Sequence, residues 1–180
     1  MVEPILHYLI PTLMLLAFFP RKKKLILLLS PLSVIMDVDF LLRLHRWVLH
    51  SMATAVFASV AAYAVANALG VKAGKKDAGT APALIVLFFV TSHLLLDVGS
   101  PGIPVLWPLS NSLYSIQLKF YTDPRTFSFT QDVVASVSPL EKALESQKTP
   151  YLTNTGAVSA ILVGLILAAR NILARRPIRR

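Results

Sequence analysis

The chain has 180 residues, of which 55% are hydrophobic and 15% charged, with a net charge of +9 and no cysteine. Soluble domains average roughly 45–50% apolar and about 25% charged residues, so this composition favours membrane spans over one large soluble core. It excludes collagenous and disordered chains, and the lack of cysteine excludes disulfides, thiolate metal sites, iron–sulfur clusters and a cysteine nucleophile.

Five apolar segments have lengths near the roughly 17–25 residues that cross a bilayer. They cover about 4–19, 25–42, 52–69, 81–98 and 153–169. The expected fold is therefore an all-α integral membrane protein, a single membrane domain over 1–180 with about five transmembrane helices. A signal peptide is disfavoured for the first segment, because the basic run Arg21–Lys24 follows the apolar stretch instead of preceding it.

The basic residues predict how these spans are oriented. With the amino terminus outside, the segments 20–24 and 70–80 and the tail from Arg170 are cytoplasmic, and they hold 12 of the 18 basic residues. Lysine and arginine in short loops favour the cytoplasmic side. We therefore expect a multi-pass cell-membrane protein with the amino terminus outside and the carboxyl terminus in the cytoplasm. Topology then explains the positive charge, and no nucleic-acid partner is expected.

Three local patterns refine this picture. Pro31 lies inside the second expected span and predicts a kink or local unwinding. Small residues repeat every four positions in the third expected span, at Ala58, Ala62 and Ala66, which predicts close packing on a neighbouring helix. The outer segment 99–152 contains a strand-like alternation over 114–121 and can hold short strands, with Asp123-Pro124 as a turn.

Ionisable residues gather at one depth, the outer ends of the first four spans. This set holds all four histidines and three aspartates: His7, Asp37, Asp39, His45, His50, His93 and Asp97. Such groups are costly inside a membrane and usually mark function. We therefore expect these seven side chains to converge in one pocket that binds a divalent metal ion.

The spacing of these residues leaves alternatives open. His93 and Asp97 are four residues apart and project from one face of a helix. They could be two ligands of one metal ion, a ligand and the carboxylate that supports it, or a simple hydrogen-bonded pair. Asp37 and Asp39 would diverge by about 200° on a regular helix, so they converge only if the backbone leaves α geometry after Pro31. Trp107 is expected to anchor the chain at the membrane interface rather than to stack on a substrate.

Four sequence blocks resemble the family of membrane-bound, metal-dependent hydrolases typified by the LexA-regulated inner-membrane hydrolase of bacteria (YdjM-like). They cover roughly the first 110 residues. The blocks are His7-Tyr8-Leu9-Ile10, Met36-Asp37-Val38-Asp39-Phe40, His45-Arg46-Trp47-Val48-Leu49-His50-Ser51, and Ser92-His93-Leu94-Leu95-Leu96-Asp97 with Gly102-Ile103-Pro104-Val105-Leu106-Trp107-Pro108. The chain departs from the family pattern at Met36, Phe40 and Trp47. The resemblance implies a metal site built from the His and Asp positions.

The function expected from the cluster and the resemblance together is hydrolysis at the outer membrane–water boundary. The seven His and Asp residues would bind zinc, which imidazole and carboxylate ligands suit, and the substrate would be a phosphoester or a lipid head group. The candidate catalytic residues are Arg46, Asp39 and Ser51, with Arg46 holding an anionic oxygen. A transporter-like conduit, haem ligation and a non-catalytic membrane or metal-binding protein are the alternatives.

Overall fold

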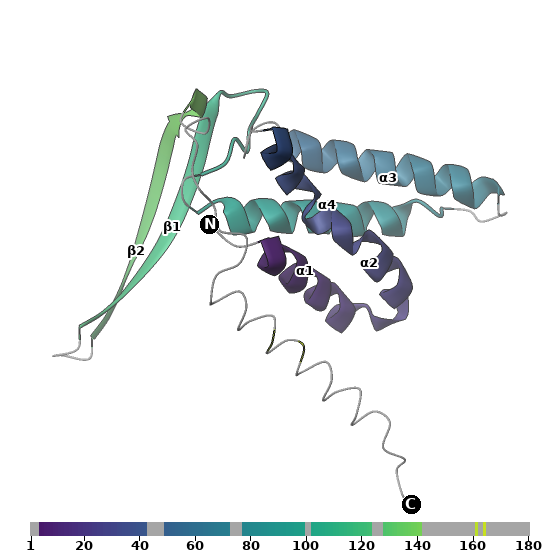
Figure 1. Cartoon of the computed structure of the whole chain (residues 1–180), viewed down its shortest axis with the longest axis horizontal. Coiled ribbons are helices and arrows are strands. Elements are labelled where there is room, and N and C mark those ends of the chain that lie inside the picture. The colour runs from purple at the N-terminus through teal and green to yellow at the C-terminus, as the bar shows by residue number, and fades with distance from the viewer. Residues whose placement is uncertain are drawn as a thin grey trace, which may run out of the picture.

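The computed structural model describes residues 4–42, 49–72, 77–99, 102–123 and 128–141 together with 161 and 164, without the side chains of 39–42, 71–72, 122–123 and 128–129. Its helices form one body, and two strands project from it as a hairpin (Figure 1). The elements are α1 (Pro4–Phe18), the 3-10 helix η1 (Pro20–Lys22), α2 (Lys23–Leu29), the 3-10 helices η2 (Ser30–Ser33) and η3 (Ile35–Leu42), α3 (Met52–Lys72), α4 (Thr80–Asp97), β1 (Ser112–Asp123) and β2 (Ser128–Pro139).

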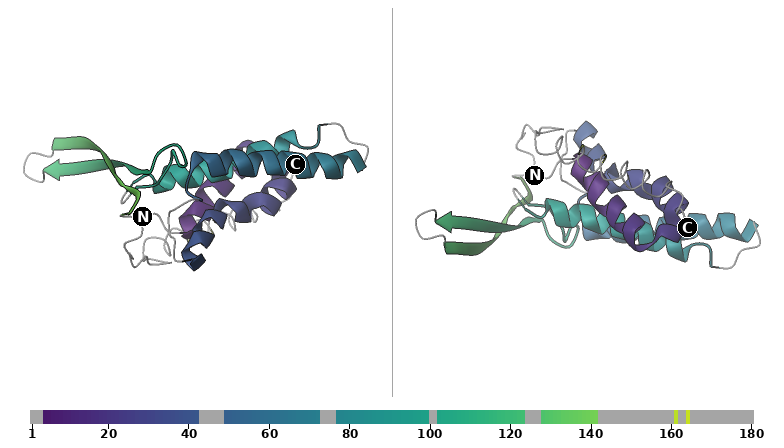
Figure 2. Two further views of the ribbon diagram at one scale, coloured as in Figure 1. Left: turned by 90° about the horizontal axis from the view of Figure 1, so that it is seen from above. Right: turned by 90° about the horizontal axis from the view of Figure 1, so that it is seen from below.

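Helix α4 is the centre of the helical body. It packs against α3 on one side and against α1 and α2 on the other (Figures 1 and 2). Its buried apolar side chains belong to two clusters, one reaching Met36 and Ala55 and the other reaching Leu15 and Ile26. Because α4 has neighbours on both sides, it positions residues that come from distant parts of the chain.

The small residues of α3 allow it to lie close to α4, as the alanine repeat predicts. Ala55, Ala58 and Ala62 pack in the first cluster. Just before the start of α4, a Cβ on Gly79 would lie only 2.5 Å from the carbonyl oxygen of Tyr63, so the backbones can approach this closely only with glycine there. The Gly79 amide also donates a hydrogen bond to Asn67 Oδ1 over 2.8 Å. Such interhelical hydrogen bonds add to packing between helices in a membrane.

The chain reverses between α1 and α2. The segments Pro4–Phe18 and Pro20–Val38 meet at an angle of 115° and together have the length and composition of a broken span or a re-entrant loop. The second expected span, 25–42, is not one α-helix: α2 ends at Leu29 and the chain continues as η2 and η3. Pro31 lacks an amide hydrogen and disrupts the α-helical ladder, so the predicted local unwinding is confirmed.

The two strands form an antiparallel hairpin of twelve residues each. The predicted alternation over 114–121 is confirmed as part of β1, whereas β2 was not predicted. The base of the hairpin is tied to the body, because Ile103 and Tyr114 exchange backbone hydrogen bonds and the amide of Ile116 donates to the carbonyl oxygen of Val98. Gly102 has a φ of +104°, which favours glycine, and a Cβ there would lie 2.8 Å from the Tyr114 carbonyl oxygen.

The prediction of an all-α fold with five transmembrane helices is wrong. Over the described residues there are two helices long and apolar enough to cross a membrane, Met52–Gly70 and Thr80–Asp97, or up to three spans if the bent pair counts as one. The outer segment carries the hairpin instead of short strands. Apolar composition is the same in a spanning helix and in a bent, re-entrant pair, so counting apolar segments overestimates the spans.

The fifth expected span, 153–169, and the basic tail from Arg170 lie outside the described residues, apart from 161 and 164, which are helical. The turn predicted at Asp123-Pro124 lies at the edge of the described range, since β1 ends at Asp123.

Candidate metal centre

Four ionisable side chains meet at the end of α4 that lies beside the base of the hairpin. They are Asp37 of η3, His50 just before α3, and His93 and Asp97 of α4, and one ligand atom from each lies within 4.8 Å of the others. The side chains of His50, His93 and Asp97 are at most 1% exposed, and that of Asp37 is 20% exposed. The group is therefore interior, with one edge at the surface.

Helix geometry and the break at Pro31 bring three of these residues together. His93 and Asp97 are one turn apart on the buried face of α4, which also carries Phe89 and Val90. Asp37 reaches the same place because the chain after Pro31 runs as 3-10 helix, in which the Asp37 amide donates to the carbonyl oxygen of Val34 over 3.1 Å. The backbone thus leaves α geometry over η3, whereas the convergence of Asp39 with Asp37 stays a prediction because the Asp39 side chain is not described.

Ser51 caps helix α3 and so positions His50. Its Oγ accepts a hydrogen bond from the Thr54 amide at 3.3 Å and lies 3.1 Å from Thr54 Oγ1. A serine oxygen at this position satisfies an amide that the first helical turn leaves unpaired. The amide of Met52, the residue after Ser51, donates to the carbonyl oxygen of Val105 over 2.9 Å. His50 therefore precedes a helix start that is held on two sides.

Five separations among the four ligand atoms, from 3.2 to 3.9 Å, are close to those around a small tetrahedral cation. His93 Nε2 lies 3.2 Å from His50 Nε2, 3.5 Å from Asp37 Oδ1 and 3.6 Å from Asp97 Oδ2. His50 Nε2 lies 3.4 Å from Asp97 Oδ2 and 3.9 Å from Asp37 Oδ1. Zinc ligands at about 2.0–2.2 Å in tetrahedral geometry are roughly 3.3–3.6 Å apart. The His/Asp group could therefore hold a metal ion.

A backbone carbonyl sets the orientation of His93. Its Nδ1 lies 2.7 Å from the carbonyl oxygen of Ser33, which can only accept a hydrogen bond, so Nδ1 carries the proton. The lone pair is then on Nε2, the nitrogen that faces the other three residues. Histidines that bind metals usually donate their second ring nitrogen to such a partner. Ser33 is itself held by a hydrogen bond from its Oγ to the carbonyl oxygen of Ser30 over 2.7 Å.

His7 joins the group from α1. It is 1% exposed, its ring stacks on that of His93 with centroids 4.0 Å apart, and its Nε2 lies 3.3 Å from Asp97 Oδ1. That contact has the distance of an ion pair but not the direction of a hydrogen bond, because neither ring nitrogen of His7 has a hydrogen-bond partner within the described residues. Asp97 thus presents one oxygen to His7 and the other to His50 and His93.

Unpartnered polar atoms and the closeness of two carboxylates also fit a cation here. Besides the two nitrogens of His7, the buried Asp37 Oδ2 has no hydrogen-bond partner in the part of the chain that the structure describes. Buried polar atoms without partners cost free energy. Two carboxylates within a few ångströms also repel each other in a low dielectric. A divalent ion would balance both negative charges, so these residues fit the divalent metal ion that the sequence predicts.

The structure brings together five of the sequence-predicted ligands: His7, Asp37, His50, His93 and Asp97. The backbone of Asp39 lies in η3, but its side chain is not described, and His45 and Arg46 lie outside the described residues. Sequence reasoning did not identify the Ser33 carbonyl as the partner of His93. Its only sequence signal is Pro31 two residues earlier, which indicates that backbone groups nearby leave the α-helical ladder.

Comparison with known proteins gives one match. The model of a family described as YdjM inner membrane protein matches residues 8–173 of the 180. No curated protein and no solved structure matches the chain.

Proposed function

The chain belongs to the YdjM inner membrane protein family, and from its His/Asp group we propose that it is a membrane-embedded, metal-dependent hydrolase. The observation that carries the proposal is the group of ligand atoms from Asp37, His50, His93 and Asp97, all within 4.8 Å of one another, with His93 oriented by the Ser33 carbonyl. The proposed substrates are phosphoesters or lipid head groups at the membrane–water boundary.

Zinc is the proposed metal. Two imidazole nitrogens and two carboxylate oxygens at tetrahedral spacing suit zinc better than magnesium or calcium, which prefer six or more oxygen ligands. A bound zinc ion supplies Lewis-acid activation of water and of a phosphoryl oxygen.

The residues around the ligands have separate proposed roles. Asp37 is the most exposed member of the group, and its Oδ2, which has no hydrogen-bond partner among the described residues, would accept a proton from an attacking water. His7 would hold the Asp97 carboxylate through Oδ1. Arg46 would bind an anionic substrate oxygen through its planar fork. Asp39 stays a candidate catalytic residue, and so does Ser51, whose capping of α3 is compatible with a positioning role.

The metal centre is proposed to face the outside of the cell membrane. Lys22 and Ala81 line the same cavity, so the basic run Arg21–Lys24 lies at the amino end of α4. Twelve to sixteen residues of helix, about 18–24 Å, separate Ala81 from His93 and Asp97. By the preference of basic residues for the cytoplasm, the metal centre and the amino terminus would lie outside. Placement of the carboxyl terminus in the cytoplasm stays a prediction.

A non-catalytic metal-binding protein would use the same ligands, and a conduit would add polar groups along the membrane depth. Within the described residues the buried ionisable groups lie at one end of α4. This arrangement favours a site that opens to one side over a conduit.

Metal analysis and a hydrolysis panel together test the proposal. The full chain is purified in detergent as wild type, His93→Ala and the control Thr12→Val, which alters another buried polar side chain of the body. We expect stoichiometric zinc and hydrolysis of a lipid-like phosphodiester in wild type and control, and loss of both in His93→Ala. Full activity in His93→Ala would refute the proposal. Zinc without hydrolysis of any phosphoester, ester or amide would support the non-catalytic alternative.

A further inference from the structure

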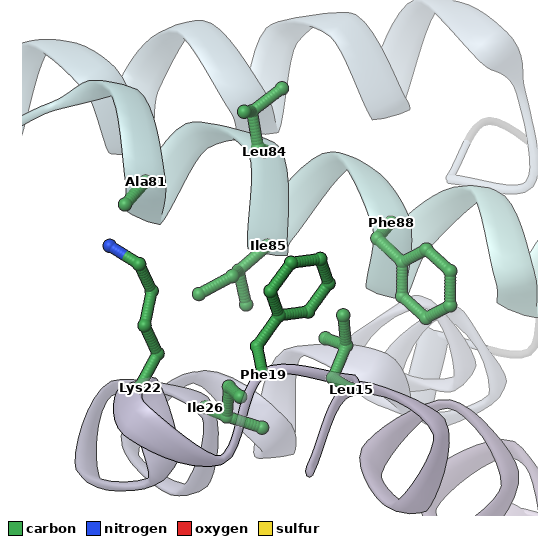
Figure 3. Close-up of a pocket in the computed structure, with 8 residues that line it drawn as sticks. All are labelled: Leu15, Phe19, Lys22, Ile26, Ala81, Leu84, Ile85 and Phe88. Atoms are coloured by element: carbon green, nitrogen blue, oxygen red, sulfur yellow. The ribbon is translucent and has the colours of Figure 1, made fainter. Parts of the chain in front are cut away.

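A cavity lies at the end of the helical body opposite the metal centre. Its volume is about 210 Å³, and it lies between the reversal of α1 into α2 and the first turns of α4 (Figure 3). Leu15, Ile26 and Ile85 form buried apolar walls, at 5%, 0% and 7% exposure. Because the chain is an inner-membrane protein, such an apolar space would be filled by hydrocarbon rather than by water.

Lys22 is the charged residue that lines this cavity. Figure 3 shows its side chain extending from η1 toward Ala81 of α4, with the ammonium group near Ala81. Three further exposed basic residues, Arg21, Lys23 and Lys24, adjoin it in sequence. Within the described part of the chain, none of these four makes an ion pair. The opening therefore presents positive charge that no described carboxylate compensates.

The start of α4 adds a second source of positive potential. Helix α4 begins after Gly79 without a side-chain cap, and the third residue of the helix is Pro82, which has no amide hydrogen. The first-turn amides of Thr80 and Ala81 therefore face the same end as Lys22, and the positive end of the helix dipole lies there. The helix start would favour the binding of an anion at the opening, but the evidence for the site is the cavity and Lys22.

We propose that this cavity binds an anionic phospholipid, with one acyl chain between α1 and α4 and the phosphate at Lys22. An apolar space with a lysine at its opening matches a molecule that has a hydrocarbon chain and a negative head group. The positive run around Lys22 would increase affinity for anionic over zwitterionic lipids. The site uses residues distinct from the metal centre, so it does not depend on the proposed hydrolase activity.

Native mass spectrometry of the full chain in detergent tests the proposal. Phosphatidylglycerol and phosphatidylcholine with identical acyl chains are titrated separately, and sn-glycerol 1-phosphate is added as a soluble head-group competitor. The variants are Lys22→Gln, its matched control Lys24→Gln, which removes the same charge outside the cavity, and Ala81→Phe, which fills the opening. Thermal unfolding in detergent verifies that each variant is folded.

We expect wild type to bind phosphatidylglycerol more tightly than phosphatidylcholine. Lys22→Gln should lower the affinity for phosphatidylglycerol about fivefold, to a value close to that for phosphatidylcholine. Lys24→Gln should change the affinity for phosphatidylglycerol less than twofold, and Ala81→Phe should lower the affinity for both lipids. Equal losses in Lys22→Gln and Lys24→Gln would overturn the site in favour of diffuse charge attraction. Full competition by sn-glycerol 1-phosphate would overturn the acyl-chain site in favour of a head-group site. If Ala81→Phe does not fold, the two lysine variants alone decide the outcome.

Discussion

His7 and Asp97, ninety residues apart in sequence, are within 3.3 Å of each other through His7 Nε2 and Asp97 Oδ1. The second oxygen of the same carboxylate lies 3.4 Å from His50 Nε2 and 3.6 Å from His93 Nε2. Asp97 is thus the residue of α4 that meets both α1 and the segment just before α3 at the metal centre. Changes at Asp97 should therefore affect metal binding more than any comparable surface change.

Asp97→Asn should weaken zinc binding by at least about 10–100-fold, the loss typical even of residues that only support metal ligands. The amide has almost the same shape but supplies one neutral oxygen in place of a charged pair. Zinc affinity is measured by competition with a chelating dye. The matched control is Asp77→Asn, at an exposed residue before α4, which should bind zinc as wild type does. Equal affinities in the two variants would exclude Asp97 as a ligand.

His7→Phe should separate the stacking of His7 from its contact with Asp97. Phenylalanine keeps an aromatic ring against His93, where the centroids are 4.0 Å apart, but removes the nitrogen near Asp97 Oδ1. We expect the folded protein to retain zinc stoichiometry while its affinity falls about 10–100-fold. His7→Ala should lower the melting temperature as well, because it leaves a cavity in a buried position. Unchanged affinity in His7→Phe would show that His7 only packs.

The parts of this site that could be predicted from sequence are those whose geometry depends on residues close together in the chain. The pairing of His93 with Asp97 follows from helix periodicity alone. The position of Asp37 depends on the path of the chain after Pro31, and a proline shows that a helix is disturbed but not where the chain then leads. The Ser33 carbonyl could not be predicted, since every residue has a carbonyl and only the fold selects one.

The fold shows the same limit. The alternation over 114–121 predicts β1 because side chains of a strand alternate between faces. The pairing of Leu118 with Val133 requires a register that no single-strand pattern contains. The reversal between α1 and α2 is equally non-local, because it places Leu15 and Ile26 against Phe89 of α4. A count of apolar segments cannot distinguish that arrangement from two separate spans.

Gly79→Ala should destabilise the packing of α3 on α4. An added Cβ would lie 2.5 Å from the Tyr63 carbonyl oxygen, a backbone atom that cannot move without shifting α3. Overpacking of this kind typically costs about 1–3 kcal/mol. Gly99→Ala is the matched control, because a Cβ there meets nothing within 4 Å. Thermal unfolding in detergent should show a lower melting temperature for Gly79→Ala alone, and equal melting temperatures would contradict the close approach of the helices.

Removing the metal should destabilise the wild-type protein and leave His93→Ala nearly unaffected. A ligand that binds only the folded state at a thousand times its Kd adds about 4 kcal/mol to the free energy of unfolding. Chelation removes this contribution and also leaves the neighbouring carboxylates of Asp37 and Asp97 without the divalent ion between them. The melting temperature in detergent should therefore fall on addition of a chelator and recover when zinc is restored in excess. In His93→Ala the chelator has no bound ion to remove, so its melting temperature should stay constant. An equal decrease in both proteins would mean that the chelator acts elsewhere than at this centre.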